Sequence, residues 1–441
     1  MKYNMVCLST IIFVILLRWL NPSWALLISF AVLLFNMFYL SAMCPNLFKD
    51  DEKPFQNGLL FYPILMCILL ILFGTKIYIV AGTFAILVLG DNLASITGRE
   101  FKGLPLPWNN SKTWIGSTVF ILAAFVGAFF IMKWVEPSLS LKYVTVASIL
   151  GALACAFVES VNLKIKDDIL ITAAGAIVLL FLSEMSLSKL GTTLSNQWGS
   201  FGGIVTLLLL IFIHLVITFY AYYKNFVTLD GFLCGLIMGI VFLFFASLKG
   251  YLIPLIFFVF GTKATLYNYE KKSEAGLAQE SEGARGFKHA FGNGLLGTLF
   301  MLLAVTSPNS EVFFLGMVAA FAAALADTTA SELGQVYGNN PVLATTLQSA
   351  SVGDKGAVSI EGTICGLIAA LAIAFAAWIL GLVNHYCIPI IVIAAFAGMY
   401  GESYLNAWAG EREFTINNEI SNLIATGISA IFAIILYAIQ V

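Results

Sequence analysis

The chain has 441 residues, of which 60% are hydrophobic and 10% are charged, and its formal net charge is -2. Soluble domains average about 45–50% apolar and about 25% charged residues. The composition therefore excludes a water-soluble globule, and the near-neutral charge gives no case for nucleic acid as a partner. With about 20 apolar residues per crossing, the sequence predicts an all-α polytopic membrane protein embedded in a lipid bilayer.

Apolar runs predict about fifteen transmembrane helices along the chain. The first run follows a lysine but has no small-x-small cleavage site, so we interpret it as a span and not as a signal peptide. The 7 cysteines form no CxxC pair and the 3 histidines are far apart, which gives no zinc or redox pattern. The expected spans lie near residues 4–20, 23–43, 57–74, 76–96, 114–134, 143–162, 168–187, 200–222, 229–247, 251–267, 289–305, 312–334, 358–380, 385–407 and 419–440.

The charges are distributed unevenly over the loops between these spans. Most of the 22 lysines and arginines fall on the face that receives the N-terminus, which the positive-inside rule places in the cytoplasm. Most of the 24 acids fall on the same face, many at helix ends, where a charge is costly and marks a functional candidate. We expect a multi-pass protein of a bacterial or archaeal plasma membrane with its functional sites facing the cytoplasm.

The acids recur in a repeated order. The pattern D-x-x-A-S-x-x-G occurs from Asp91 to Gly98 and again from Asp327 to Gly334. Asp and Ser are four residues apart in each copy, so they share a helix face. Each copy is followed by S/T-x-x-G-S/T at the start of a later span, by Glu-Ser and by a polar pair: residues 113–117, 159–160 and 167–168 in one half, 359–363, 402–403 and 418–419 in the other.

This order predicts an internal duplication. We expect two parallel seven-helix repeats, 1–195 and 225–441, joined by a linker transmembrane helix at 196–224. The linker is needed because a repeat with an odd number of spans must be followed by one extra crossing before a second copy can adopt the same orientation.

Carboxylates, serines and lysines at one surface suit a particular chemistry. Carboxylates bind Mg²⁺, which often bridges to substrate phosphates, and lysine and arginine bind phosphate oxygens. Neither a GxxxxGK[ST] loop nor a soluble-kinase motif occurs in the sequence. The pattern therefore favours phosphoryl or nucleotidyl transfer to a lipid acceptor.

Two resemblances sharpen this interpretation. Segments of the first repeat resemble the dolichol kinase/phytol kinase family, membrane enzymes that use CTP to phosphorylate long isoprenoid alcohols. The second repeat is similar to the family whose plant members are phytyl-phosphate kinases. The resemblances rest on residues 90–99, 110–117, 158–160 and 166–169 in the first repeat, and on 261–263, 276–286, 293–294, 326–334, 345–346, 352–356, 359–363 and 417–422 in the second.

The resemblances imply two sites that use Mg²⁺ and CTP. In each site, one acid would take the proton from the lipid substrate that receives the phosphoryl group. The catalytic candidates are Asp91, Glu159, Asp327 and Glu402. The first site would hold metal through Asp91, Glu159 and Asp168, and would bind the triphosphate through Ser95, Arg99, Ser111 and Lys112. The second would hold metal through Asp327, Glu402 and Glu419, and would bind phosphates through Lys263, Arg285, Ser331, Asp354 and Lys355.

Together the two repeats imply a fused enzyme. The first would convert an isoprenoid alcohol to its monophosphate, and the second would convert the isoprenyl phosphate to the diphosphate. The CDP-diacylglycerol synthases have a similar motif style, so a cytidylyltransferase that forms a CDP-lipid is one alternative. A lipid or isoprenoid transporter is another, because parallel repeats with buried acids also occur in that class.

Overall fold

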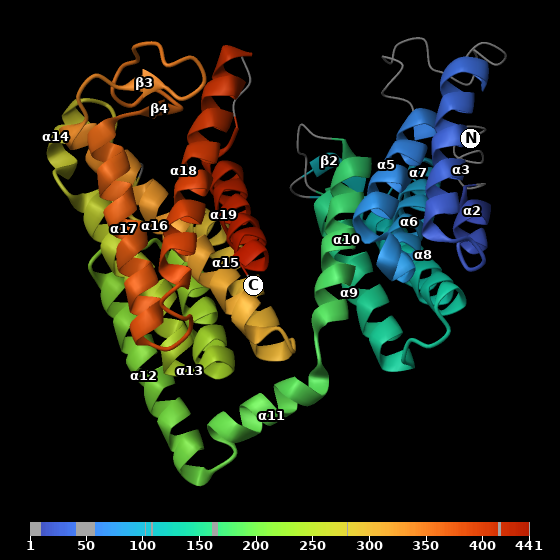
Figure 1. Cartoon of the computed structure of the whole chain (residues 1–441), viewed down its shortest axis with the longest axis horizontal. Coiled ribbons are helices and arrows are strands. Elements are labelled where there is room, and N and C mark those ends of the chain that lie inside the picture. Colours follow the sequence, from blue (N-terminus) through green and yellow to red (C-terminus); the bar gives the residue numbers. More distant parts are fainter. Residues whose placement is uncertain are drawn as a thin grey trace. The chain divides into compact units, whose positions relative to one another are not determined.

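The computed structural model describes residues 10–40, 58–101, 103–106, 109–160, 166–279, 281–412 and 416–440. Contacts divide the chain into a first unit, Met1–Glu184, and a second unit, Met185–Val441 (Figure 1). Among the described residues, 11 helices are long and apolar enough to cross a membrane, or up to 12 if a bent pair counts as one span. Many large apolar side chains are exposed on these helices, as lipid-facing surfaces require.

The first unit is a helical bundle that also contains one short antiparallel β-hairpin. Its elements are α2 (Ile11–Leu16), α3 (Pro22–Leu34), η1 (Phe35–Leu40), α5 (Gly58–Phe73), η4 (Gly74–Lys76), α6 (Ile77–Ala85), η5 (Ile86–Asp91), α7 (Asn92–Glu100), β1 (Pro105–Leu106), β2 (Asn109–Thr113), α8 (Trp114–Val135), α9 (Leu141–Ser160) and α10 (Asp167–Glu184).

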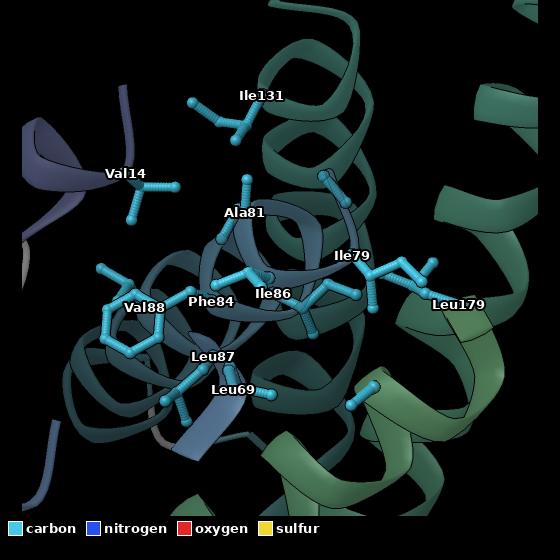
Figure 2. Packing of buried hydrophobic residues seen from close by; sticks show 14 of the residues in the cluster. Val14, Leu69, Ile79, Ala81, Phe84, Ile86, Leu87, Val88, Ile131 and Leu179 are labelled. Atoms are coloured by element: carbon cyan, nitrogen blue, oxygen red, sulfur yellow. The ribbon is translucent and has the colours of Figure 1, made fainter. Parts of the chain in front are cut away.

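The core of the first unit is built around α6 and η5. Ile79, Ala81, Ile86 and Val88 are fully buried there, and Figure 2 shows them beside apolar side chains of neighbouring helices. Gly82 allows α8 and α10 to approach, because a Cβ at this position would lie 2.8 Å from Met132 of α8 and 2.9 Å from Leu179 of α10. Close packing of small residues is the usual source of helix association in a bilayer.

The second unit contains the remaining helices and a second antiparallel β-hairpin. Its elements are α11 (Leu187–Trp198), α12 (Phe201–Tyr223), α13 (Leu229–Leu266), α14 (Tyr269–Glu274), η6 (Ser281–Gly283), α15 (Phe287–Thr306), α16 (Ser310–Tyr337), β3 (Val342–Leu343), β4 (Ala357–Val358), α17 (Ile360–Ile379), α18 (Cys387–Glu411) and α19 (Asn418–Gln440).

Helix α16 is the centre of the second unit. It packs against α13, α15, α17, α18 and α19, and its residues from Leu315 to Ala326 are essentially fully buried. Alanine dominates this stretch and lets the neighbouring backbones come close. A Cβ at Gly366 of α17, for example, would lie 2.9 Å from the Ala326 carbonyl oxygen.

The element α13 is a hairpin of two antiparallel arms. Its 38 residues contain a non-helical break at Ser247 (φ 58°, ψ -171°). His214 contacts both arms, with its Nδ1 2.9 Å from the Tyr251 hydroxyl and its Nε2 3.2 Å from the Leu236 carbonyl oxygen. In a straight helix Leu236 and Tyr251 would be about 22 Å apart. Because one histidine side chain contacts both, the chain must reverse between them.

A second reversal occurs at η4 in the first unit. The Asn92 amide donates a hydrogen bond to the Tyr62 hydroxyl at 3.0 Å, although the two residues are 30 positions apart. The expected span pairs 57–74 with 76–96, and 229–247 with 251–267, are therefore the arms of two hairpins. Each hairpin counts as one of the 11 long helices, and its two arms correspond to two of the expected spans. The expected first span lies partly outside the described residues, and of its described part Ile11–Leu16 is helical.

The two units also differ in extent from the expected repeats. Residues 187–198 and the expected linker helix at 196–224 belong to the second unit by their contacts. The Trp198 indole donates to the Phe244 carbonyl at 2.8 Å, and His214 contacts α13 as described above. By its contacts the chain divides after Glu184, near the expected end of the first repeat.

Candidate active site

The repeated motifs make the same local contact in both units. Thr113 caps α8 by accepting a hydrogen bond from the Gly116 backbone N–H at 3.1 Å. Ser359 caps α17 by accepting one from the Gly362 N–H, also at 3.1 Å. Such caps satisfy a helix donor that would otherwise lack a partner.

The glycines of these motifs lie where two helices meet. A Cβ at Gly116 would approach Ala94 and Gly98 of the first D-x-x-A-S-x-x-G segment. A Cβ at Gly362 would approach Ala330 and Gly334 of the second. The helices that carry or adjoin the motifs also pack in the same order: α7, α8, α9 and α10 in one unit, α16, α17, α18 and α19 in the other.

In the first unit the predicted residues gather around Lys112. Its Nζ forms ion pairs with Glu159 and, at 2.8 Å, with Asp167. Asp91 ends the π-helical turn η5, a geometry that often occurs at functional sites. The charges of Asp168, Lys112 and Glu159 all act on Asp91. The structure therefore brings together the acids and the lysine that the sequence predicted for this site.

Lys112 stays protonated between these two carboxylates. Burial disfavours its charge, but the carboxylates of Glu159 and Asp167 more than offset this effect and raise its pKa. Ser111 is the neighbour of Lys112, and its hydroxyl lies 2.6 Å from the Asn109 side-chain oxygen. Ser95 lies one helical turn after Asp91. The side chain of Arg99 lies outside the described part of the chain.

The second unit contains a polar cavity of about 1170 Å³. Its walls come from α15, α16, α18, the first turns of α13, α17 and α19, the segment before α15 and the loop between β3 and β4. All but one of the residues predicted for this site line the cavity. They are Arg285, Asp327, Ser331, Asp354, Lys355, Glu402 and Glu419.

Asp327 and Glu402 form the acidic part of this cavity. Their charges repel each other, and the Asn406 amide donates to one Glu402 oxygen at 2.5 Å. The positive charge of Lys355 acts on Glu402. A divalent cation would relieve the repulsion between the two carboxylates and could bind substrate phosphates at the same time.

Arg285 forms the basic part of the cavity and is held in an unusual way. Its backbone pairs with the segment before α13: its N–H donates to the Phe226 carbonyl at 2.9 Å, and its carbonyl accepts from the Thr228 N–H at 3.2 Å. The guanidinium lies over the Phe257 ring at 5.2 Å, and its Nε is buried without a protein partner. Burial lowers its pKa to about 10, although the charge of Glu332 opposes the effect.

Lys263 was predicted for this site, but the structure places it elsewhere. It is exposed and does not line the cavity. Its neighbour in the quoted motif, Gly261, has the structural role, because a Cβ there would lie 2.8 Å from the Arg285 guanidinium.

Sequence reasoning missed the buried ion pair between Lys272 and Glu332. The Lys272 Nζ lies 2.5 Å from a Glu332 oxygen, and the Gln279 amide donates to the other oxygen at 2.5 Å. Asn293 was also not predicted as a site residue, although it lines the cavity with a buried side-chain oxygen that has no protein partner. A buried acceptor of this kind needs a partner that the protein itself does not supply.

The expected metal triads are not assembled. Within the described residues, no three His, Cys, Asp or Glu side chains are grouped so that they could hold one metal ion. Lys112 contacts Glu159 in the first unit, and Lys288 lies 3.4 Å from Glu419 in the second. Pairs of acids remain in both units, and one buried Glu159 oxygen has no protein partner.

Comparisons with known proteins place this chain among membrane proteins. The profile of the family described as "Integral membrane protein DUF92" matches residues 212–436. An uncharacterized membrane protein of Synechocystis sp. is 35% identical over 213 residues, 48% of this chain and 83% of that protein. No solved structure matches the chain.

Two plant relatives carry more specific names. The chloroplast protein VTE6 of Arabidopsis thaliana is 32% identical over 193 residues, which are 42% of this chain and 58% of that protein. A probable phytol kinase of the wheat (Triticum aestivum) chloroplast is 30% identical over 78 residues, which are 18% of this chain and 26% of that protein.

Proposed function

The chain belongs to the DUF92 family of integral membrane proteins, and from this premise we propose that it is a bifunctional isoprenoid kinase with CTP as the phosphoryl donor. The first unit phosphorylates an isoprenoid alcohol of the phytol, geranylgeraniol or farnesol class. The second unit phosphorylates the isoprenyl monophosphate to the diphosphate. The relative named as a probable phytol kinase supports the substrate class.

One observation carries the proposal. The polar cavity of the second unit joins an acidic end, Asp327 and Glu402, to two cations, Lys355 and Arg285, inside an apolar helical bundle. Phosphoryl transfer needs this combination, because catalysis consists largely of positioning and of neutralising phosphate charge. A lipid acceptor explains why such a site lies among helices with lipid-facing surfaces.

Phosphorylation of the alcohol and of the monophosphate requires different roles of the site residues. In both, an acceptor oxygen attacks the γ-phosphorus of CTP, the bond to the β-phosphate oxygen breaks, and CDP leaves. A monophosphate acceptor is already anionic, so Arg285 and Lys355 need only orient it. An alcohol must lose a proton, and Asp91 is the better acceptor for it because Glu159 is engaged by Lys112.

A divalent cation fits the acids that are present. Mg²⁺ commonly binds through one or two carboxylates together with waters and substrate phosphates, so a full protein triad is not required. Asp327 and Glu402 would hold it in the second unit, and Glu159 and Asp168 in the first, so that Asp91 stays available to accept the proton. When bound, it would neutralise the charge that develops on the transferred phosphoryl group.

The test is an assay of purified protein with geranylgeraniol, farnesol, phytol and their monophosphates, each with CTP or ATP. Asp91→Asn should abolish alcohol phosphorylation but retain monophosphate phosphorylation, and Asp327→Asn should do the reverse. Glu100→Gln and Glu270→Gln, at exposed acids, are the matched controls and should leave both steps unchanged.

Three results would refute the proposal. If no lipid phosphate forms with any acceptor, the chain is not a kinase of this class. A CDP-lipid released with pyrophosphate would identify a cytidylyltransferase. Lipid flux into proteoliposomes without nucleotide would identify a transporter.

A further inference from the structure

A second pocket, of about 100 Å³, lies in the same unit and is apolar. It is lined by α12, both arms of α13 and α15. Three glycines at four-residue intervals, Gly231, Gly235 and Gly239, line the pocket from the first arm of α13. Gly231 and Gly239 allow Arg285 and His214 to approach the arm, and only at Gly235 would a Cβ meet no atom within 4 Å, so the pocket is open there. The large apolar side chains around it include Ile217, Phe232, Met238, Phe242, Leu255 and Phe258.

The apolar pocket meets the polar cavity at three residues. Arg285, Gly286 and His289 line both. His289 Nδ1 accepts a hydrogen bond from the Gly286 N–H at 3.3 Å, so a neutral His289 carries its proton on Nε2 and is a donor there. Two hydrogen-bond donors, one of them charged, therefore lie between an apolar compartment and a polar one.

Arg285 is the strongest sign of a ligand at this junction. The residue is 6% exposed, and its Nε has no protein partner. The hydrogen bond that its Nη2 donates to the Thr265 hydroxyl is long, at 3.4 Å. Leaving a buried charge without full hydrogen bonding is costly. An anion that binds here would supply the missing partner.

We propose that the apolar pocket receives the phosphate-proximal isoprene units of an isoprenyl monophosphate, whose phosphate is bound by Arg285 and His289. This inference rests on the proposed function of the second unit and adds to it the place of the lipid. Pockets that enclose a whole drug-sized ligand measure about 300–1000 Å³. The smaller volume here fits one narrow chain segment, and the rest of the chain extends into the bilayer along the exposed apolar side chains of α12.

The occupant is a phosphate monoester with a single chain. A monoester ends in a dianion that reaches from the junction into the polar cavity, where Lys355 and the acids lie. A phospholipid of the bilayer carries two chains, and its phosphate is a diester with one negative charge. It matches both the narrow pocket and the buried guanidinium less well.

The experiment is photoaffinity labelling of the purified full chain, in detergent, with geranylgeranyl monophosphate that carries a diazirine on the first isoprene unit. Peptide mass spectrometry should find the label within 231–239 or 251–258. Gly235→Leu should reduce labelling at least several-fold, because a Cβ at this position meets no atom within 4 Å and the side chain can fill the pocket. Gly202→Leu in α12 is the matched control, because its Cβ also meets no atom within 4 Å and it does not line the pocket.

Competition tests the role of Arg285. Unlabelled geranylgeranyl monophosphate should compete at least tenfold better than geranylgeraniol in the native chain, and Arg285→Gln should remove most of that difference. Label on another surface, equal labelling of Gly235→Leu and Gly202→Leu, or equal competition by phosphatidic acid would overturn the inference. A phosphoryl-transfer assay on the same preparation separates the two hypotheses, because labelling reports binding whether or not the kinase reaction occurs.

Discussion

The buried ion pair of Lys272 and Glu332 provides a quantitative test of the second unit. Both side chains are nearly inaccessible, with 2% and 3% exposure. Lys272 Nζ also donates to the Thr265 carbonyl at 2.6 Å, so the pair ties α14 to α13 and α16. Removing one partner of a buried pair leaves an uncompensated charge, which costs about 3–5 kcal/mol.

We expect Lys272→Met to lower the free energy of unfolding by about 3 kcal/mol, at the lower end of that range, because Gln279 still donates to Glu332. Glu332→Leu should cost about as much, since it leaves a buried ammonium with carbonyl acceptors alone. The double variant replaces both charges by apolar groups and should recover about 2 kcal/mol relative to the sum of the single losses. Lys271→Met, at the exposed neighbour, should change stability by no more than about 0.5 kcal/mol.

The assay is reversible unfolding in mixed micelles of a mild detergent and SDS, followed by tryptophan fluorescence and compared across the double-mutant cycle. The segment that leads to Arg285 follows Lys272 directly, so Lys272→Met should also raise the KM for isoprenyl monophosphate. The reasoning fails if Lys272→Met behaves like Lys271→Met, or if the two single losses simply add in the double variant.

Two further predictions concern packing and orientation. Gly362→Ala should destabilise the second unit by about 1–3 kcal/mol, because the new Cβ would lie 2.7 Å from the Ala330 carbonyl oxygen. Gly116→Ala should be tolerated, because the nearest atom to its Cβ would lie 3.2 Å away. Thermal unfolding of the two variants compares them, and equal losses would contradict the packing argument. We also infer that the polar cavity faces the cytoplasm: Ser351→Cys should react with impermeant maleimide only from that side, and His385→Cys, at the opposite end of α17, only from the other. The reverse labelling pattern would contradict the inferred orientation.

Much of the candidate site could be predicted because its signals are local in sequence. Asp327 and Ser331 lie on one helix, and the cap at Ser359 follows from the S/T-x-x-G pattern alone. Glu402 was predicted as a site residue because the order of the motifs repeats between the two halves of the chain. These residues lie around one cavity in the structure.

Other features have no local signal. Lys272 and Glu332 are 60 positions apart, and neither lies at a repeated spacing, so only the packed structure reveals their contact. Lys263 was predicted from its position in a motif, but α13 places it on an exposed face. The carboxylates of the first unit were expected to hold a metal, and no local pattern indicated that Lys112 would lie between Glu159 and Asp167.

The reversal of α13 at Ser247 bears on how the protein is made. A hairpin enters and leaves the bilayer on the same side, so during synthesis only its turn must be translocated. That turn carries one charge, Lys249, next to Ser247. In the orientation inferred above, both ends of the element stay on the side of the ribosome, where Thr228 meets Arg285. The wall of the apolar pocket is therefore on the correct side of the membrane before α15, α16 and α18 have been synthesised to complete the polar cavity.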